Sequence, residues 1–262
     1  MTSLQRRSIT DIGIRIPDSI TLPIAPELLA VATNYAEITR GTGLALVEAA
    51  VAQDPALKLV AILTVVKLMA FTRSDQNPTI LAHNGAAIEC GAGCAACCHQ
   101  MVEATIPEAI LVAMQIGGEA DPRRSAILAE AQAYLREGRQ RSLARPCPLL
   151  RDNRCSVYEV RPLVCRSVLS PNARKCRDAL ASLRRDEATA SRSDIYEAPL
   201  LLSRGDQAGL RGICKDLKLQ DDVVHLAETV AAILGDRFIV DRWLAGEKVF
   251  TATTENRVPE PA

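Results

Sequence analysis

The sequence is poor in aromatic residues and lacks the patterns that mark several common protein classes. Aromatic residues make up 3% of its 262 residues, there is one tryptophan, and the formal net charge is zero. Few stacking side chains, no overall positive field and no recognisable binding motif argue against nucleic-acid recognition. A glycine-rich G-x-G-x-x-G loop for a dinucleotide is also missing. No catalytic triad, paired-carboxylate site or P-loop identifies a substrate.

The sequence also lacks a segment that we would expect to enter or cross a membrane. Residues 1–26 contain Arg6 and Arg7 but no apolar stretch and no small-residue cleavage site, so they do not look like a secretory signal. The most apolar run, residues 56–71, is interrupted by Lys58 and Lys67 and is short for a bilayer-spanning helix. We therefore expect a cytoplasmic protein with no membrane partner, in a compartment where thiols stay reduced.

The residues that are abundant favour helices. The chain is 48% hydrophobic, and Ala, Leu, Val and Ile supply most of this, while alternating β-branched patterns are scarce. The expected fold class is mainly α, with irregular cysteine-rich metal-binding loops and one short hairpin. We expect a helical N-terminal segment over 1–85, a cysteine-cluster metal-binding domain over 86–190, C-terminal helices over 191–250 and a disordered tail over 251–262.

Local patterns place the helices more closely. Two helices are expected over 27–40 and 44–53, separated by Gly41-Thr42-Gly43, and Asp54-Pro55 is expected to cap a third over 56–72. Residues 74–78, which end in proline, suggest a loop. Further on, Thr105-Ile106-Pro107-Glu108 predicts a capping box that opens a helix to residue 115 or 116. Later helices are expected over 122–135, 173–187, 197–217, 222–234 and 236–246.

Nine cysteines are the most informative feature of the sequence, and eight of them form two groups. Thiolates are soft ligands for zinc, copper(I) or iron–sulfur centres, and a C-x2-C spacing lets two sulfurs reach one ion from a tight turn. An odd number of cysteines in a chain of this length argues against a disulfide framework. The predicted metal ligands are Cys90, Cys94, Cys97 and Cys98 in the first group, and Cys147, Cys155, Cys165 and Cys176 in the second.

The surroundings of the second group predict how two of its thiols meet. Arg151-Asp152-Asn153 is a turn pattern between Cys147 and Cys155, so we expect a short hairpin or knuckle that brings these two cysteines together. By spacing alone, Cys176 could equally be a ligand or a small buried residue of its helix. Cys214 is isolated in the sequence and is expected to be structural.

The adjacent pair Cys97-Cys98 bears on the number of metal atoms. Neighbouring side chains on a non-helical backbone point in roughly opposite directions, so these two thiols would have difficulty binding the same ion. They could serve two separate centres, or one polynuclear cluster whose metal atoms lie apart. We therefore predict more than one metal atom in each chain.

Basic residues are concentrated around the second group of cysteines. Residues 121–194 contain 16 Lys and Arg against 9 Asp and Glu, which is typical of a solvated surface but would also compensate a net negative thiolate site. Arg161 and Arg166 bracket Cys165 and could donate hydrogen bonds to thiolates or hold an anionic substrate. Alternatively, Arg161 caps a turn and pairs with Glu159. His99 is either a nitrogen ligand or a polar residue at the rim of the site.

The order of these motifs resembles one known family. Cys90-x3-Cys94-x2-Cys97-Cys98, followed by Cys147-Pro-Leu-Leu and then Cys155-Ser-Val-Tyr-Glu-Val-Arg-Pro-Leu-Val-Cys165-Arg166, is similar to the YkgJ-like CxxCxxCC family. The resemblance implies a cluster that chelates zinc or iron. It implies chelating roles for the first seven cysteines, and it strengthens the case for Cys176. The three-residue gap after Cys90 departs from the family's spacing and puts that ligand most in question.

The cofactor implied is zinc or iron, either mononuclear or as an iron–sulfur cluster, and the partners are metal ions. Three functions are compatible with the sequence. The first is a cytoplasmic metal-binding protein of undefined role. The second is a cluster-dependent redox or protein-modifying enzyme, since flagellin lysine N-methylases carry a similar cysteine cluster. The third is a zinc-stabilised structural module whose helices bind a protein partner.

Overall fold

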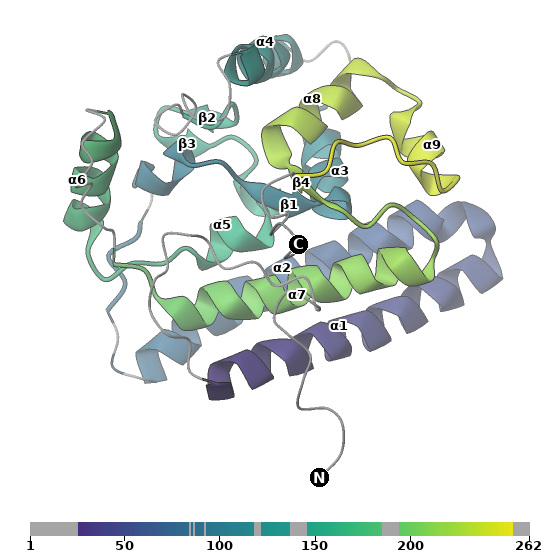
Figure 1. The fold of residues 1–262 in the computed structure, drawn as a ribbon, viewed down its shortest axis with the longest axis horizontal. Coiled ribbons are helices and arrows are strands. Elements are labelled where there is room, and N and C mark those ends of the chain that lie inside the picture. The colour runs from purple at the N-terminus through teal and green to yellow at the C-terminus, as the bar shows by residue number, and fades with distance from the viewer. Residues whose placement is uncertain are drawn as a thin grey trace, which may run out of the picture.

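The computed structural model of the chain is mainly helical, which confirms the predicted fold class (Figure 1). It describes residues 26–83, 85, 87–91, 93–117, 122–136, 146–184 and 194–253. The α-helices are α1 (Pro26–Gln53), α2 (Lys58–His83), α3 (Ile106–Gln115), α4 (Pro122–Arg136), α5 (Leu163–Ser167), α6 (Ala173–Arg184), α7 (Glu197–Asp216), α8 (Leu226–Gly235) and α9 (Ile239–Leu244). The strands and short 3-10 helices are β1 (Glu103–Thr105), β2 (Leu150–Arg151), β3 (Arg154–Cys155), β4 (Val223–His225), η3 (Pro55–Leu57), η4 (Ala96–His99) and η6 (Tyr158–Val160).

Three long helices form one side of the molecule. Helices α1, α2 and α7 run alongside one another (Figure 1), and α7 packs closely on α1. A Cβ atom on Gly205 would lie 2.4 Å from the carbonyl oxygen of Ala32, and one on Gly209 would lie 2.6 Å from Cβ of Thr39. Glycine on α7 therefore lets the two backbones approach more closely than side chains would allow.

Helix α1 is continuous, so the predicted break at Gly41-Thr42-Gly43 is wrong. Gly43 is buried, and a Cβ atom there would lie 2.5 Å from Cδ1 of Ile213 on α7. Glycine inside a helix costs about 0.5–1 kcal/mol relative to alanine. The contact between α1 and α7 offsets that cost, and the helix does not end.

Helix α2 is also longer than expected, and the predicted loop over 74–78 is wrong. Its buried face carries polar anchors: Asn77 donates to Ser167 on α5 at 3.0 Å, and Arg73 pairs with Asp206 on α7. These contacts hold the backbone helical through Pro78. The capping of η3 by Asp54 is as predicted, since its side chain accepts a hydrogen bond from the Ala56 amide.

By length and composition alone, the segment Pro55–Thr79 could cross a membrane, which corrects the expectation that this apolar run is too short. A core helix of a soluble protein passes the same test. One face of this helix is buried against α1, α3, α5 and α7. Its other face leaves Val60, Leu68 and Phe71 exposed.

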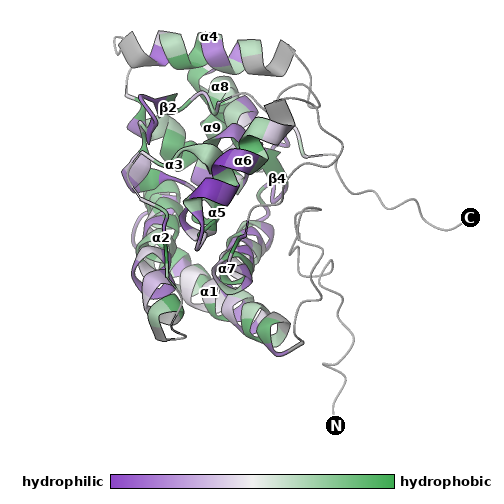
Figure 2. Ribbon diagram, turned by 90° about the vertical axis from the view of Figure 1, so that its left-hand side faces the viewer, coloured by the Kyte–Doolittle hydropathy of each residue, from purple (hydrophilic) through white to green (hydrophobic). Residues whose placement is uncertain are grey.

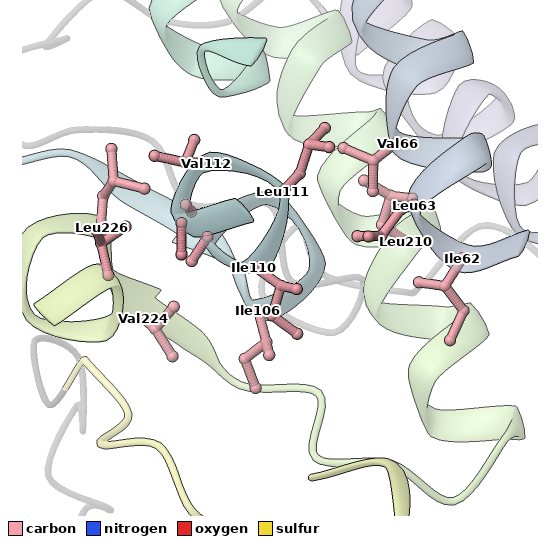
Figure 3. Packing of buried hydrophobic residues seen from close by; sticks show 14 of the residues in the cluster. Ile62, Leu63, Val66, Ile106, Ile110, Leu111, Val112, Leu210, Val224 and Leu226 are labelled. Carbon is pink, nitrogen blue, oxygen red and sulfur yellow. The ribbon is translucent and has the colours of Figure 1, made fainter. Parts of the chain in front are cut away.

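A second group of elements packs on this layer and shares its core. The capping box is confirmed: Thr105 accepts from the Glu108 amide, and the Glu108 carboxylate accepts from the Thr105 amide at 2.7 Å. Strand β1 pairs antiparallel with β4 in the register Ala104↔Val224, which brings α3 and α8 side by side. Figure 3 shows how the apolar side chains of α2, α3, α7 and the β4–α8 segment meet in one cluster: Ile62, Leu63, Val66, Ile106, Ile110, Leu111, Val112, Leu210, Val224 and Leu226.

The C-terminal part of the chain was expected to form helices followed by a disordered tail, and the structure differs from this at two places. Residues 223–225 form β4 where a helix start was expected, because they pair with β1. At the start of the predicted disordered tail, Ala252 makes a bridge with Val224, and the amide of Thr253 donates to Val223 at 2.8 Å. The rest of that tail, residues 254–262, lies outside the described residues.

Candidate metal centre

The first cysteine group lies on a loop that ends in a 3-10 turn. The amide of Cys94 donates to the Gly91 carbonyl at 3.0 Å, and Gly93 has a φ of 89°, so the loop turns tightly where glycine permits it. Cys97 and Cys98 both belong to η4. Successive residues of a 3-10 helix are about 120° apart, since it has 3.0 residues per turn. The expectation of a non-helical backbone at this pair is therefore wrong, although the adjacent thiols still point in different directions.

The predicted hairpin is present and joins the two cysteine groups. Strands β2 and β3 pair antiparallel, with Leu150 opposite Cys155, around Asp152 and Asn153, whose φ values are 48° and 58°. Positive φ at both central residues is the geometry of a tight two-residue hairpin turn, which Asp and Asn tolerate. The amide of Cys147 donates to the Cys98 carbonyl at 2.6 Å. This bond fixes the start of the second group against the end of the first.

Helix α5 carries Cys165 and is held by polar contacts on both sides of that residue. At its start, the Leu163 amide donates to Oε1 of Glu108 at 2.7 Å. At its end, the Ser167 hydroxyl is hydrogen-bonded to Ser203 on α7 and accepts from Asn77 on α2. The Glu108 carboxylate is 1% exposed and Ser167 is fully buried. The position of Cys165 is thus set by the buried interior of the protein.

Cys90 and Cys176 lie on the loop before η4 and on α6, which contacts η4. The sulfur of Cys90 accepts a hydrogen bond from the Ser170 amide at 3.2 Å, which favours the thiolate form. Next to it, the Glu89 amide donates to the Ser170 carbonyl, and the Glu89 carboxylate accepts from the Ala173 amide at the start of α6. Cys176 follows one turn later, on a helix that packs against η4. Both cysteines are half-buried.

The thiols influence one another's pKa, which shows which of them are neighbours. Burial raises the pKa of Cys165 well above its usual value, and the thiols of Cys147, Cys97 and Cys155 raise it further. Burial also raises the pKa of Cys147 to about 11, and Cys155 and Cys97 add to that increase. Such like-charge effects weaken with distance. We call these four mutually close residues the core set: Cys97, Cys147, Cys155 and Cys165.

A second set lies on the other side of Cys97. Burial raises the pKa of Cys90, and the thiols of Cys94, Cys97 and Cys176 raise it further. Cys97 is thus near both sets. The pKa of Cys97 is also raised, first by a hydrogen bond with Cys98 and then by burial. We call Cys90, Cys94 and Cys176 the peripheral set. Cys98 is hydrogen-bonded to Cys97 through its thiol and to the Cys147 amide through its carbonyl.

The eight grouped cysteines fit a soft metal by their donor chemistry. All nine cysteines of the chain are free thiols, including Cys214, which is 1% exposed on α7. As the side chains stand, the described residues contain no group of three or more His, Cys, Asp or Glu arranged to hold one ion. Coordination therefore requires the thiols to come closer together than they are in this structure. The loop, hairpin and helix ends that carry them already adjoin.

Arg161 and Arg166 differ in how they meet the thiols. Arg166 is 8% exposed and donates to the carbonyl oxygens of Arg161 and Glu159 and to the hydroxyl of Ser74. These hydrogen bonds tie the loop before α5 to α2, so a large part of this side chain's role is structural. The Arg166 charge still lowers the pKa of Cys155.

Arg161 is the better placed of the two arginines to act on bound metal. Its charge lowers the pKa of Cys97, Cys155 and Cys165. Its guanidinium lies 3.9 Å from the ring centroid of the exposed Tyr158, and its buried Nε has no hydrogen-bond partner. A buried N–H donor with no partner beside several thiols could bond a metal-bound sulfur.

His99 is a buried residue of η4, with Nδ1 3.0 Å from the Ala95 carbonyl oxygen. With the proton on Nδ1, this contact is a hydrogen bond, and Nε2 keeps its lone pair. Metal-binding histidines commonly donate their second nitrogen to a carbonyl in this way. The structure is therefore compatible with His99 as a ligand and with His99 as a residue that braces η4.

Two shallow hollows adjoin the thiols. The first lies between η4 and α6, and Cys97 and Cys176 both line it, together with Val168 and Leu180. The second adjoins Cys147 and is lined also by Gln100 and His225. Sequence reasoning did not identify these hollows, and it did not identify Glu108 as the residue that holds α5. The capping-box pattern marked Glu108 but carried no information about Leu163.

Comparison with known proteins gives one match. Residues 89–187 match the model of the CxxCxxCC family, described as "Putative zinc- or iron-chelating domain". The match covers the whole cysteine-cluster region of the chain, and it begins one residue before Cys90. Searches of the curated proteins and of the solved structures found no match.

Proposed function

We propose that this protein binds zinc or iron through two thiolate centres, in a reducing compartment such as the cytoplasm. The proposal is supported by eight free thiols on elements that contact one another: η4 contacts α6, and the Cys147 amide donates to the Cys98 carbonyl. Thiolates in sets of four are the donor set of structural zinc and of cubane iron–sulfur clusters. The matched family supports zinc or iron as the metal.

The proposed division of ligands follows the two sets. The core set supplies four thiolates to one centre. The peripheral set supplies three to the other, and Cys98 completes it. Arg161 would offset the negative charge of the core centre and donate to one of its sulfurs. Bound metal supplies the charge that makes it favourable for these thiols to lose their protons and lie close together.

The test is elemental analysis of the full chain purified without oxygen, together with its visible spectrum. We expect at least two metal atoms per chain. Absorption at about 400 nm that dithionite bleaches would indicate iron–sulfur centres. A colourless protein that contains zinc would indicate closed thiolate zinc sites. Cys155→Ser should lose metal, whereas Cys214→Ala, which removes a thiol from the core of the protein, should retain it. One metal or none in the anaerobic preparation would contradict the proposal.

The same measurement separates the other candidate functions. A colourless protein that unfolds when zinc is removed would be the structural module. An enzyme would need a substrate site beside the metal, and the hollow lined by Cys97 and Cys176 is the observation that favours this alternative.

A further inference from the structure

The elements that carry the two thiol sets differ in how much buried packing supports them. Three residues of the core set, Cys147, Cys155 and Cys165, are carried by the β2–β3 hairpin and α5, and the fourth, Cys97, is on η4. The apolar residues of the hairpin and α5 belong to the main hydrophobic cluster: Leu149 is 3% exposed, Val157 is 4% exposed and Leu163 is 1% exposed. Cys147 and Cys155 themselves pack against that cluster. The fold therefore holds these positions whether or not metal is bound.

The peripheral set has much less support. Helix α6, which carries Cys176, lies at the edge of the molecule, apart from the long helices and from α8 and α9 (Figure 1). Its principal contacts within the described residues are with η4. Figure 2 shows a largely hydrophilic surface on this helix, and Arg174 is 85% exposed at the side chain. The loop that carries Cys90 and Cys94 is also mostly exposed, at residues 87, 89, 91 and 93.

The hollow between η4 and α6 gives access to the place where the two sets meet. Cys97 of the core set and Cys176 of the peripheral set line it from opposite elements, and Ala179, Leu180 and Val168 complete its apolar wall. A soft donor such as a small thiol could approach a metal held by Cys176 through this opening. The wall carries few polar groups that would compete with sulfur for the metal.

We propose that the peripheral set is an exchangeable metal centre and that its metal is the link that holds α6 to the body of the protein. This inference rests on the proposed function. The core set, by contrast, is a structural centre that keeps its metal. A metal bound between Cys90, Cys94, Cys98 and Cys176 crosslinks the exposed loop and η4 to α6, an element with few other buried contacts. Its removal by a soft ligand therefore loosens α6 and leaves the hairpin and α5 in place.

The experiment treats the metal-loaded full chain with a colorimetric chelator and follows metal release. Release should occur in two phases whose rates differ by about tenfold or more, the size of effect that supporting contacts have on metal affinity. Cys176→Ser should abolish the fast phase and retain the slow one, and Cys155→Ser should do the reverse. Cys214→Ala should leave both phases unchanged.

Amide hydrogen exchange measured after the fast phase tests the structural part. Amides of residues 173–184 should lose protection, while those of 149–157 and 163–167 keep it until the slow phase. Single-phase release, or unchanged protection of α6 after the fast phase, would overturn the inference and leave metal binding itself intact. A chain that binds no metal would instead refute the proposed function.

Discussion

Replacing Glu108 by Gln tests whether one buried carboxylate fixes both the start of α3 and the start of α5. Oε1 accepts from the Leu163 amide at 2.7 Å, while Oε2 accepts from the Thr105 amide at 2.7 Å and from Nε2 of Gln207 at 3.0 Å. All of these partners are donors. A glutamine amide has one acceptor, so its NH2 group must face a donor on one side or the other.

The expected cost follows from these contacts. A hydrogen bond to a charged group contributes about 1.5–3 kcal/mol, and a buried donor left without a partner costs about 1–3 kcal/mol. Because the amide can still satisfy one side, we expect Glu108→Gln to lower the free energy of unfolding by about 2–4 kcal/mol. For a chain of this size, the melting temperature should fall by about 5–15 °C.

Trp243 provides the assay, because this single tryptophan is fully buried and its fluorescence reports unfolding in denaturant. The matched control is Glu37→Gln on α1, whose side chain is 57% exposed and 3.9 Å from Arg40. The control should change stability by less than about 0.5 kcal/mol, as exposed ion pairs contribute little. If Glu108→Gln costs no more than the control, the proposed role of Glu108 in holding α5 is wrong.

Three further substitutions test the helix packing and the metal centre. Gly205→Ala places a Cβ atom 2.4 Å from the Ala32 carbonyl oxygen and should destabilise the protein by about 1–3 kcal/mol in denaturant. Gly41→Ala meets no atom within 4 Å and should stabilise the protein by about 0.5–1 kcal/mol. Equal effects of the two glycine substitutions on stability would contradict the close contact of α1 with α7. Arg161→Gln should weaken metal binding about tenfold in competition with a chelator and leave the peripheral release phase unchanged. Unaltered affinity would show that Arg161 does not act on the core centre.

Features that depend on adjacent residues were predictable from the sequence. Asp152 and Asn153 predicted the hairpin because their own side chains tolerate positive φ, which the turn requires. Thr105 and Glu108 predicted the start of α3 because a capping box is closed within four residues. The donor chemistry of the cysteines was likewise readable, since thiol softness does not depend on the fold.

Features that depend on distant residues were not predictable in this way. Gly43 and Pro78 are local reasons for a helix to end, yet α1 and α2 continue through them because α7 and α5 pack against those turns. The second role of Glu108 depends on Leu163, which is far along the chain and was marked by no pattern.

The sequence by itself therefore determined that the chain is helical and rich in soft ligands, because residue type and short-range spacing establish both. Only the tertiary structure decided which thiols are neighbours. Cys97 is adjacent to Cys98 in sequence, yet its close neighbours in space include Cys147, Cys155 and Cys165. Burial and long-range contacts between the hairpin, α5 and η4 create that proximity. These contacts cannot be predicted from the spacing of cysteines along the chain.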